Sequence, residues 1–366
     1  MMKLVKILGI LAAATAAAYS ADSRLELTPS ASPVEKITAK RAQIVLNGVW
    51  ECAPVATFGE ALPPAEEWGK MLVPGFTFKS NSSPGIVEQK NTSRWKNKTE
   101  RFWLRRNIDI PEQWNGEIVL RIENVMTGAR VFVDGKEVGN IIYPAEELDI
   151  SKFVTAGKTA SIALQMGSYF YPPQLLNDKP APKKNDKKPT FSRMLGISGD
   201  VFLMSRPKGA QIEDVFVKTS VEHMRLDLDV ELKNVKSGDY EVSVKIVDAA
   251  NGEVAKRFSR EFALAGEPKV KLSEKWENPK LWDVNQPNLY FAEISLKKNG
   301  KTLDTTKTRF GFREFKIDGK HFSLNGKRVR LIPLHNFFEG DTGGVRQAIS
   351  NSLDAFKKCN FNAFEL

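Results

Sequence analysis

Short segments in which hydrophobic and polar residues alternate dominate the chain from residue 44 to about residue 207. Alternation of this kind, with a period of two, predicts strands with one buried face at 102–111, 117–125 and 160–166. Residues 129–139 hold an Asp134-Gly135 pair between two such runs, which predicts a hairpin turn. Because no helical periodicity separates these segments, we expect an antiparallel β-sandwich over residues 44–207.

The segment 172–189 interrupts this pattern. It contains five prolines and five lysines but only two aspartates, a composition that cannot form a core. We interpret it as an exposed, solvated loop; a basic loop that binds a ligand is the alternative, since loops carry many binding contacts. A closing strand is expected at 199–207.

A second block of alternating strands follows at residues 208–316. Its runs at 212–220, 225–235 and 240–254 have period two, and Asn251-Gly252 and Asn299-Gly300 supply hairpin turns. About 110 residues of this texture are typical of an immunoglobulin-like sandwich. The absence of a Cys-Trp-Cys core in the sequence excludes the antibody subtype.

The pattern changes again in residues 317–366. A hairpin at Asn325-Gly326 and an apolar strand at 329–334 precede a segment, 343–360, whose apolar residues recur at three- and four-residue spacings, as on one face of a helix. A short apolar run ends the chain. Strand, helix and strand in this order indicate a βαβ unit, and a parallel sheet needs further covering elements. We therefore expect these residues to begin an α/β domain that continues beyond residue 366.

The N-terminus has the three-part layout of a signal peptide. Lys3 and Lys6 precede twelve apolar residues, and small residues follow, a stretch too short to span a bilayer. We expect residues 1–21 to be a signal peptide, residues 22–43 a flexible lead-in, and the protein to be exported to the periplasm or secreted by a bacterium. Cys52 and Cys359 have no metal-ligand spacing, so neither a structural disulfide nor a metal site is expected.

Charge changes this interpretation little. Lys and Arg exceed Asp and Glu by 54 to 44, a formal net charge of +10. Such an excess could indicate a nucleic-acid partner, but outside the 172–189 loop the basic residues are scattered, and no recognition helix or RNA-binding motif accompanies them. We expect neither nucleic-acid binding nor a cofactor.

The sequence alone offers no catalytic constellation. It contains no nucleophile elbow, P-loop or zinc-binding helix motif. Of the three histidines, His223 and His321 lie in polar, turn-like surroundings, whereas His335 follows an apolar strand at its carboxyl end, where barrel enzymes place active-site groups. His335 is therefore the best single candidate, and a purely structural role is the alternative.

Tryptophans gather in the first block. Trp68, Trp95, Trp103 and Trp114 could stack against sugar rings and form a carbohydrate platform. The alternative, which we favour, is an ordinary sandwich core, since aromatic side chains dominate such cores. Arg105 and Arg106 are neighbours on one strand and must point to opposite faces, so we expect one to pair internally and the other to meet solvent.

The order of segments from residue 50 to residue 366 resembles the N-terminal portion of family-2 glycoside hydrolases, the group of β-galactosidases, β-glucuronidases and β-mannosidases. The resembling stretches are FWLRRNIDIP, VFVDGKEVGN, GISGDVFLMSRP, LWDVNQPNLYFAEISL, GFREFKIDGKHFSLNGKRVRL and FKKCNFNAF. Each motif alone is weak, but their order and spacing are specific. The resemblance implies a jelly-roll sugar-binding domain (44–207), an immunoglobulin-like sandwich (208–316) and the first, incomplete part of a (β/α)8 barrel (317–366).

The family hydrolyses β-glycosides with retention, using two glutamates from later barrel strands, and neither has a matching position here. We therefore assign no catalytic residue and expect this chain alone to be inactive. The resemblance leaves His335 and Asn336 as candidate substrate-binding residues. His335 stands where relatives carry an asparagine, and Thr190 lies where the β-galactosidase branch carries an acid. The rival interpretations are a non-catalytic carbohydrate-binding module and a purely structural sandwich.

Overall fold

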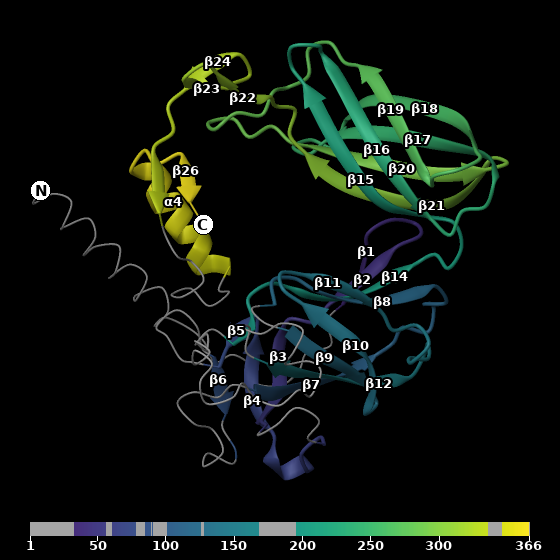
Figure 1. Ribbon diagram of the computed structural model, residues 1–366, viewed down its shortest axis with the longest axis vertical. Coiled ribbons are helices and arrows are strands. Elements are labelled where there is room, and N and C mark those ends of the chain that lie inside the picture. The colour runs from purple at the N-terminus through teal and green to yellow at the C-terminus, as the bar shows by residue number, and fades with distance from the viewer. Residues whose placement is uncertain are drawn as a thin grey trace, which may run out of the picture. The chain divides into compact units, whose positions relative to one another are not determined.

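The computed structural model describes residues 33–55, 61–77, 85–88, 90, 101–125, 128–167, 195–335 and 346–365. Strands predominate among them, and a single α-helix lies near the C-terminus of the described chain (Figure 1). The mainly β class expected from the sequence is confirmed. The signal-peptide segment and the Pro/Lys-rich loop at 172–189 fall outside the described residues. The chain divides into two compact units, the first built chiefly from residues 44–204 and the second from 35–43 and 205–333.

β-Sheets build the first unit, and the seven-stranded one is antiparallel throughout. A seven-stranded sheet has the order β10-β9-β12-β7-β3-β4-β6, a smaller sheet has the order β1-β2-β14-β8-β11, and β13 pairs with β5. A 3-10 turn, Ala65–Glu67, precedes β4. The strands are β1 (Val34–Lys36), β2 (Ala42–Val45), β3 (Gly48–Pro54), β4 (Gly69–Val73), β5 (Gly75–Phe76), β6 (Ile86–Glu88), β7 (Arg101–Asp109), β8 (Glu117–Ile122), β9 (Gly128–Val133), β10 (Lys136–Ile142), β11 (Glu146–Asp149), β12 (Thr159–Gly167), β13 (Gly196–Ile197) and β14 (Val201–Arg206).

The central strand β7 shows how the sequence pattern becomes structure. Phe102, Leu104 and Ile108 are buried on one face, whereas Asn107 and Asp109 on the other face are exposed. On one side β7 pairs along its whole length with β12, and on the other side it pairs with β3. Side chains of successive strand residues point to opposite faces, so the alternation in the sequence assigns one face of this sheet to the core.

The second unit is a two-layered sandwich of seven strands (Figure 1). One layer has the order β15-β16-β19 and the other β18-β17-β20-β21, and every pairing within them is antiparallel. The strands are β15 (Gln211–Ser220), β16 (Arg225–Lys233), β17 (Gly238–Asp248), β18 (Val254–Leu264), β19 (Lys269–Lys275), β20 (Tyr290–Lys298) and β21 (Lys301–Phe310).

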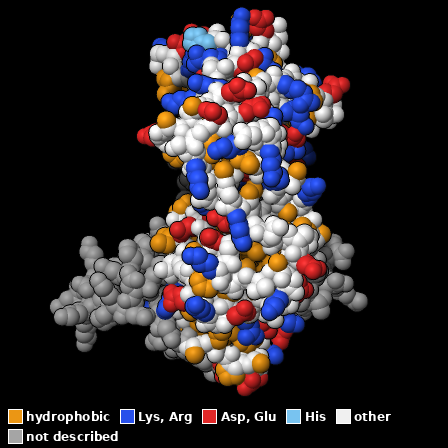
Figure 2. Space-filling view, turned by 90° about the vertical axis from the view of Figure 1, so that its right-hand side faces the viewer, with side chains coloured by type: hydrophobic (Ala, Val, Ile, Leu, Met, Phe, Trp, Pro, Cys, Tyr) orange, Lys and Arg blue, Asp and Glu red, His pale blue; other side chains and the backbone are white. Residues whose placement is uncertain are grey.

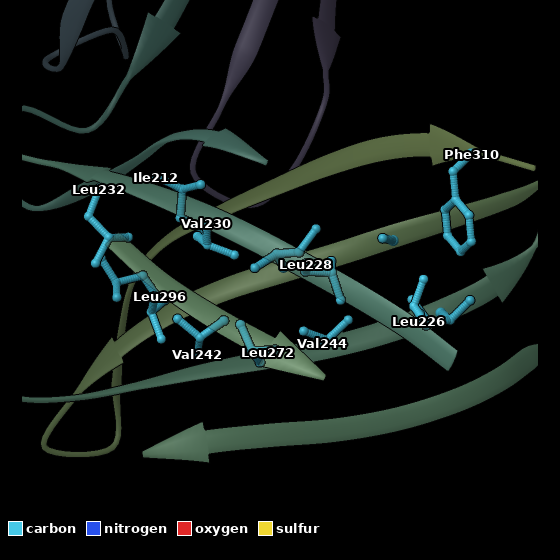
Figure 3. Packing of buried hydrophobic residues seen from close by; sticks show 14 of the residues in the cluster. Ile212, Leu226, Leu228, Val230, Leu232, Val242, Val244, Leu272, Leu296 and Phe310 are labelled. Carbon is cyan, nitrogen blue, oxygen red and sulfur yellow. The ribbon is translucent and has the colours of Figure 1, made fainter. Parts of the chain in front are cut away.

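A continuous apolar core lies between these two layers. Leu226, Leu228 and Val230 of β16 meet Val242 and Val244 of β17 there, and all five are at most 2% exposed (Figure 3). Buried and more exposed residues alternate along both strands, so every second side chain points toward the opposite layer. Burial of such aliphatic side chains contributes about 1.5–3 kcal/mol each, which is the main stabilising term of the unit.

The segment 33–43 differs from expectation. The sequence predicts a flexible lead-in over residues 22–43, but the structure contains β1, a turn and β2 in its second half. Residues 35–43 are grouped with the second unit, and β1 and β2 also lie at one edge of the five-stranded sheet, where β2 pairs with β14. The reason is a set of hydrogen bonds to residues more than 150 positions away, which no local pattern signals.

The C-terminal part begins with a small sheet of β22 (Phe315–Asp318), β23 (His321–Leu324) and β24 (Lys327–Val329), followed by β25 (Pro333–His335), α4 (Arg346–Lys358) and β26 (Ala363–Glu365). The strand expected at 329–334 is divided: Val329 ends β24, and β25 begins at Pro333, which has no N–H to donate to a ladder. The strand–helix–strand order is present, and β25 pairs with β26. That these elements open a barrel stays a prediction.

Candidate functional site

His335, the histidine singled out in the sequence, is the last residue of β25. Glu365 holds the same position in β26, the strand with which β25 pairs. The second candidate, Asn336, lies outside the described residues. The backbone therefore places His335 at the carboxyl end of a strand, as the sequence predicted, and its contact with a substrate stays a prediction.

The turn between α4 and β26 has a defined geometry. Asn360 adopts a left-handed conformation with φ of 62°, and its N–H donates to the Lys357 carbonyl at 3.0 Å. Phe361 N–H donates to the Phe356 carbonyl at 3.1 Å, and the two phenyl rings meet edge to face at 6.4 Å. This combination is a Schellman motif with its hydrophobic contact, and it ends the helix so that the chain can enter β26.

A second candidate surface lies on the face of the seven-stranded sheet that carries Arg105. Seven residues, one from each strand of this sheet, lie directly opposite one another on neighbouring strands and so form a line across the sheet. We call these seven residues the cross-sheet row: Glu88, Lys70, Glu51, Arg105, Ala163, Phe132 and Glu137. Opposite charges alternate along its first four positions, an arrangement that stabilises neighbouring strands.

Arg105 is the centre of the cross-sheet row. Its Nε donates to Glu51 Oε2 at 2.7 Å, and its guanidinium lies 4.0 Å from the centroid of the Trp68 ring. The Arg105 side chain is 21% exposed and that of Glu51 is 42% exposed. Farther along, Arg130 donates to both carboxylate oxygens of Glu137, at 3.0 and 2.5 Å. Glu51 and Glu137 keep oxygens that can accept hydrogen bonds from ligand hydroxyls.

Arg106 points the other way, into the sandwich. It is 6% exposed, and its Nη1 donates to the carbonyls of Leu46 and Asn47 at 2.7 and 2.9 Å. Burial lowers the pKa of this guanidinium below its ordinary value. The expectation that the neighbouring arginines divide between the two faces is therefore confirmed.

The tryptophans form core rather than an open platform. Trp68, Trp103 and Trp114 are 3%, 1% and 4% exposed. Trp68 and Trp103 pack with Ala53, Val55 and Ala163 in a small cluster, and Ala163 is also a member of the row. The preferred prediction of a structural role is thus confirmed for three tryptophans, and Trp95 lies outside the described residues.

Lysine neighbours lower the pKa of several carboxyl groups in the second half of the chain. These carboxyl groups, each of which interacts with a lysine, are Glu222, Asp229, Asp248, Glu277 and Glu314. A general acid near neutral pH needs the opposite shift. Burial raises the pKa of the Cys52 thiol to about 12, which makes it unreactive. Neither cysteine is in a disulfide, and no metal-binding group of His, Cys, Asp or Glu occurs within the described ranges.

Basic and acidic side chains are mixed on the part of the surface that the structure describes and Figure 2 draws. On the face drawn in Figure 2, Lys and Arg are interspersed with Asp and Glu. Several of them form ion pairs, such as Lys269 with Glu231 at 2.6 Å. Across the part of the chain that the structure covers, no helix has the length and apolarity needed to cross a bilayer.

Comparisons with known proteins give consistent matches. The family model described as "Glycosyl hydrolases family 2, sugar binding domain" matches residues 73–207, and "Glycosyl hydrolases family 2" matches residues 210–313. A Formosa agariphila protein named "Putative beta-glucuronidase" is 30% identical over 256 residues, which cover 68% of this chain and 29% of that protein. The beta-galactosidase of Priestia megaterium is 26% identical over 275 residues, covering 70% of this chain and 25% of that protein.

Solved structures show the same fold. The b-glucuronidase from Ruminococcus gnavus aligns with a TM-score of 0.68 and 20% identity over 90% of this chain and 56% of that chain. A glycosyl hydrolase family 2 member from Bacteroides cellulosilyticus aligns with a TM-score of 0.67 and 20% identity over 88% of this chain and 44% of that chain. The chain thus spans less than a third of these curated relatives and about half of these solved chains.

Proposed function

Since the chain belongs to glycoside hydrolase family 2, we propose that it is the N-terminal part of a secreted, retaining β-glycosidase whose catalytic glutamates are not in this chain. The reaction is hydrolysis of O-glycosyl bonds in carbohydrate metabolism. The names of the two curated relatives favour β-glucuronides and β-galactosides as substrate classes.

One observation carries this proposal. The two family models match consecutive segments, 73–207 and 210–313, that coincide with the two sandwiches, while the curated relatives are more than three times as long as the matched part. The unmatched part of these relatives is long enough to contain a further domain. In this proposal β25, α4 and β26 begin that domain, and His335 and Asn336 contact the substrate at its edge.

Retaining hydrolysis needs two carboxyl groups about 5–5.5 Å apart, one with a raised pKa to protonate the leaving oxygen and one ionised to attack the anomeric carbon. The lysine-paired surface carboxylates of the described residues are unsuited to the acid role, because their pKa values are lowered. Residues 1–21 have a signal-peptide pattern, which supports export.

The test compares the purified 366-residue chain with a longer protein that includes whatever coding sequence follows Leu366. We expect the longer protein to release p-nitrophenol from p-nitrophenyl β-glucuronide or β-galactoside, and the shorter chain, prepared in parallel, to release none above background. Hydrolysis by the 366-residue chain through its own carboxylates would contradict the proposal.

A non-catalytic carbohydrate-binding module is the second candidate. The cross-sheet row favours it, since Glu51 and Glu137 present partly exposed carboxylates beside Arg105 and Phe132. A stop codon directly after Leu366, together with glycan binding and no hydrolysis, would support the module and not the glycosidase.

A further inference from the structure

The short segment Glu35–Gln43 is part of the second unit, although about 160 residues separate it from the rest of that unit. Its middle is a compact turn. The N–H groups of Ile37 and Thr38 both donate to the Arg41 carbonyl at 3.0 Å. The Thr38 hydroxyl accepts hydrogen bonds from the N–H groups of Lys40 and Arg41 at 3.2 and 3.1 Å. The turn therefore fixes the direction in which the Arg41 side chain leaves the segment.

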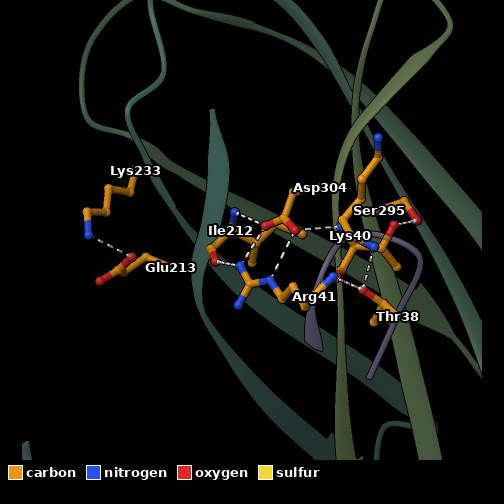
Figure 4. Close-up of polar contacts among 9 residues, drawn as sticks. Thr38, Lys40, Arg41, Ile212, Glu213, Lys233, Ser295 and Asp304 are labelled. Carbon is orange, nitrogen blue, oxygen red and sulfur yellow. Dashed lines mark hydrogen bonds and ion pairs between the residues drawn. The ribbon is translucent and has the colours of Figure 1, made fainter. Parts of the chain in front are cut away.

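Arg41 points into the second sandwich and meets Asp304 of β21 (Figure 4). Its Nε donates to Asp304 Oδ1 at 3.0 Å and its Nη2 donates to Oδ2 at 2.6 Å, a bidentate pair. The same Nη2 donates to the Ile212 carbonyl. The side chains of Arg41 and Asp304 are 9% and 0% exposed, so water screens this pair very little.

The sandwich side of this contact is itself held in place. The N–H groups of Ile212 and Thr305 donate to the two Asp304 oxygens, each at 2.8 Å. The Thr305 carbonyl accepts a hydrogen bond from the Thr38 hydroxyl at 2.8 Å, and the Thr305 hydroxyl pairs with Ser295 at 3.0 Å. We call Asp304, Thr305 and the Ile212 backbone the acceptor site, because together they offer one carboxylate and two carbonyls to a donor.

The segment cannot owe its order to its own folding. β1 has three residues and β2 has four, and a two-stranded hairpin of this length is not stable in water by itself. Its order therefore comes from the pairing of β2 with β14 and from the contacts of Thr38 and Arg41. A buried carboxylate without a cationic partner is strongly unfavourable, so the acceptor site in turn needs a cation, which Arg41 supplies. Segment and site are complementary in charge, geometry and hydrogen bonding.

We propose that the acceptor site is a peptide-docking site of the second sandwich, and that the chain fills it with its own Thr38–Arg41 turn. The recognised feature is a threonine three residues before an arginine: the hydroxyl shapes the turn and reaches the Thr305 carbonyl, while the guanidinium binds Asp304 with two parallel hydrogen bonds. A lysine would supply charge without this fork. The second sandwich is therefore completed by a segment that lies before the first sandwich in sequence.

Hydrogen exchange in the full chain tests the docking. In the natural protein the amides of Ile37 and Thr38 should exchange slowly, and Arg41→Met should accelerate both at least tenfold. In Arg41→Lys, the exchange rates of both amides should lie between those of the natural protein and those of Arg41→Met. Lys40→Ala is the matched control, because Lys40 lies in the same turn with an exposed side chain. Unchanged exchange in Arg41→Met, or equal acceleration in Lys40→Ala, would overturn the proposal.

Rescue by an added peptide separates docking from general stabilisation. A synthetic peptide of residues 33–43 should bind the full-length Arg41→Met protein and raise its melting temperature, whereas the same peptide with methionine at position 41 should do neither. If Arg41→Met does not fold, the same two peptides are added to Thr38→Ala, which loses the hydroxyl contact with Thr305 but keeps the Arg41–Asp304 pair. Failure of the arginine peptide to bind either variant would overturn the proposal.

Discussion

Asp248, at the end of β17, shows how single charged residues are accommodated in the second sandwich. Its side chain is 10% exposed and accepts a hydrogen bond from Lys280 Nζ at 2.6 Å. A further bond comes from the Ala250 N–H at 2.9 Å. The lysine hydrogen bond is the main cause of a lowered Asp248 pKa, and the Ala250 N–H adds to it. Folding therefore favours the ionised carboxylate at this position.

We predict that Asp248→Asn destabilises the protein in a pH-dependent way. The folded-state pKa lies below the ordinary 3.8, so the stabilisation is present above pH 3.8 and is lost as the pH falls through the folded-state pKa. At pH 7 the free energy of unfolding should drop by about 1 kcal/mol, because a hydrogen bond to a charged group is lost while the shape is kept.

The measurement is denaturant unfolding of both proteins from pH 7 to pH 2. Glu277→Gln is the control, since Glu277 pairs with Lys275 at a fully solvated position and should show almost no change. A difference between Asp248→Asn and the natural protein that stays constant down to pH 2 would contradict the assigned role.

At the scale of elements, two Asn-Gly hairpin turns show how one residue can both form a turn and stabilise its surroundings. Asn299-Gly300 joins β20 to β21 and Asn325-Gly326 joins β23 to β24, with φ between 50° and 75° at all four residues. These values match the type I′ turn that Asn-Gly pairs favour. The two turns differ in one respect: Asn325 also anchors its hairpin. Its Oδ1 accepts from Glu314 N–H and its Nδ2 donates to the Trp282 carbonyl, both at 2.9 Å.

Alanine substitution at the two turns should therefore have unequal effects. Asn299→Ala loses only the tolerance for positive φ, at a cost of about 1 kcal/mol. Asn325→Ala also loses two hydrogen bonds, for about 2–3 kcal/mol in total. Hydrogen exchange should show faster opening of β22–β24 in Asn325→Ala alone. Equal costs for both variants would mean that the Asn325 anchor does not stabilise the hairpin.

At the scale of the whole molecule, local patterns predicted most of the fold. Alternation located β7, β16 and β17, and Asp-Gly and Asn-Gly pairs located the hairpin turns at Asp134-Gly135, Asn299-Gly300 and Asn325-Gly326, because strand periodicity and positive φ are properties of neighbouring residues. Cross-strand register and long-range partners have no such local signal. The cross-sheet row depends on six pairings, and the partner of Arg41 lies 263 positions away. For the candidate site, the sequence placed His335 at a strand end and favoured buried tryptophans.

Two separate cores imply two separate unfolding events. Leu228 belongs to the core of the second unit and Leu164 to the first, and both are fully buried. Replacing either by alanine should cost about 2–5 kcal/mol, which shifts a melting temperature by several degrees. Multi-domain proteins commonly violate two-state unfolding.

Differential scanning calorimetry should therefore resolve two transitions in the natural protein. Leu228→Ala should lower one of them and Leu164→Ala the other, each leaving its counterpart within about 1 °C, because the lost contacts are confined to one core. Arg41→Met should shift the same transition as Leu228→Ala, although residue 41 precedes the first sandwich in sequence. A shift of the Leu164-dependent transition by Arg41→Met would instead assign the N-terminal segment to the first unit.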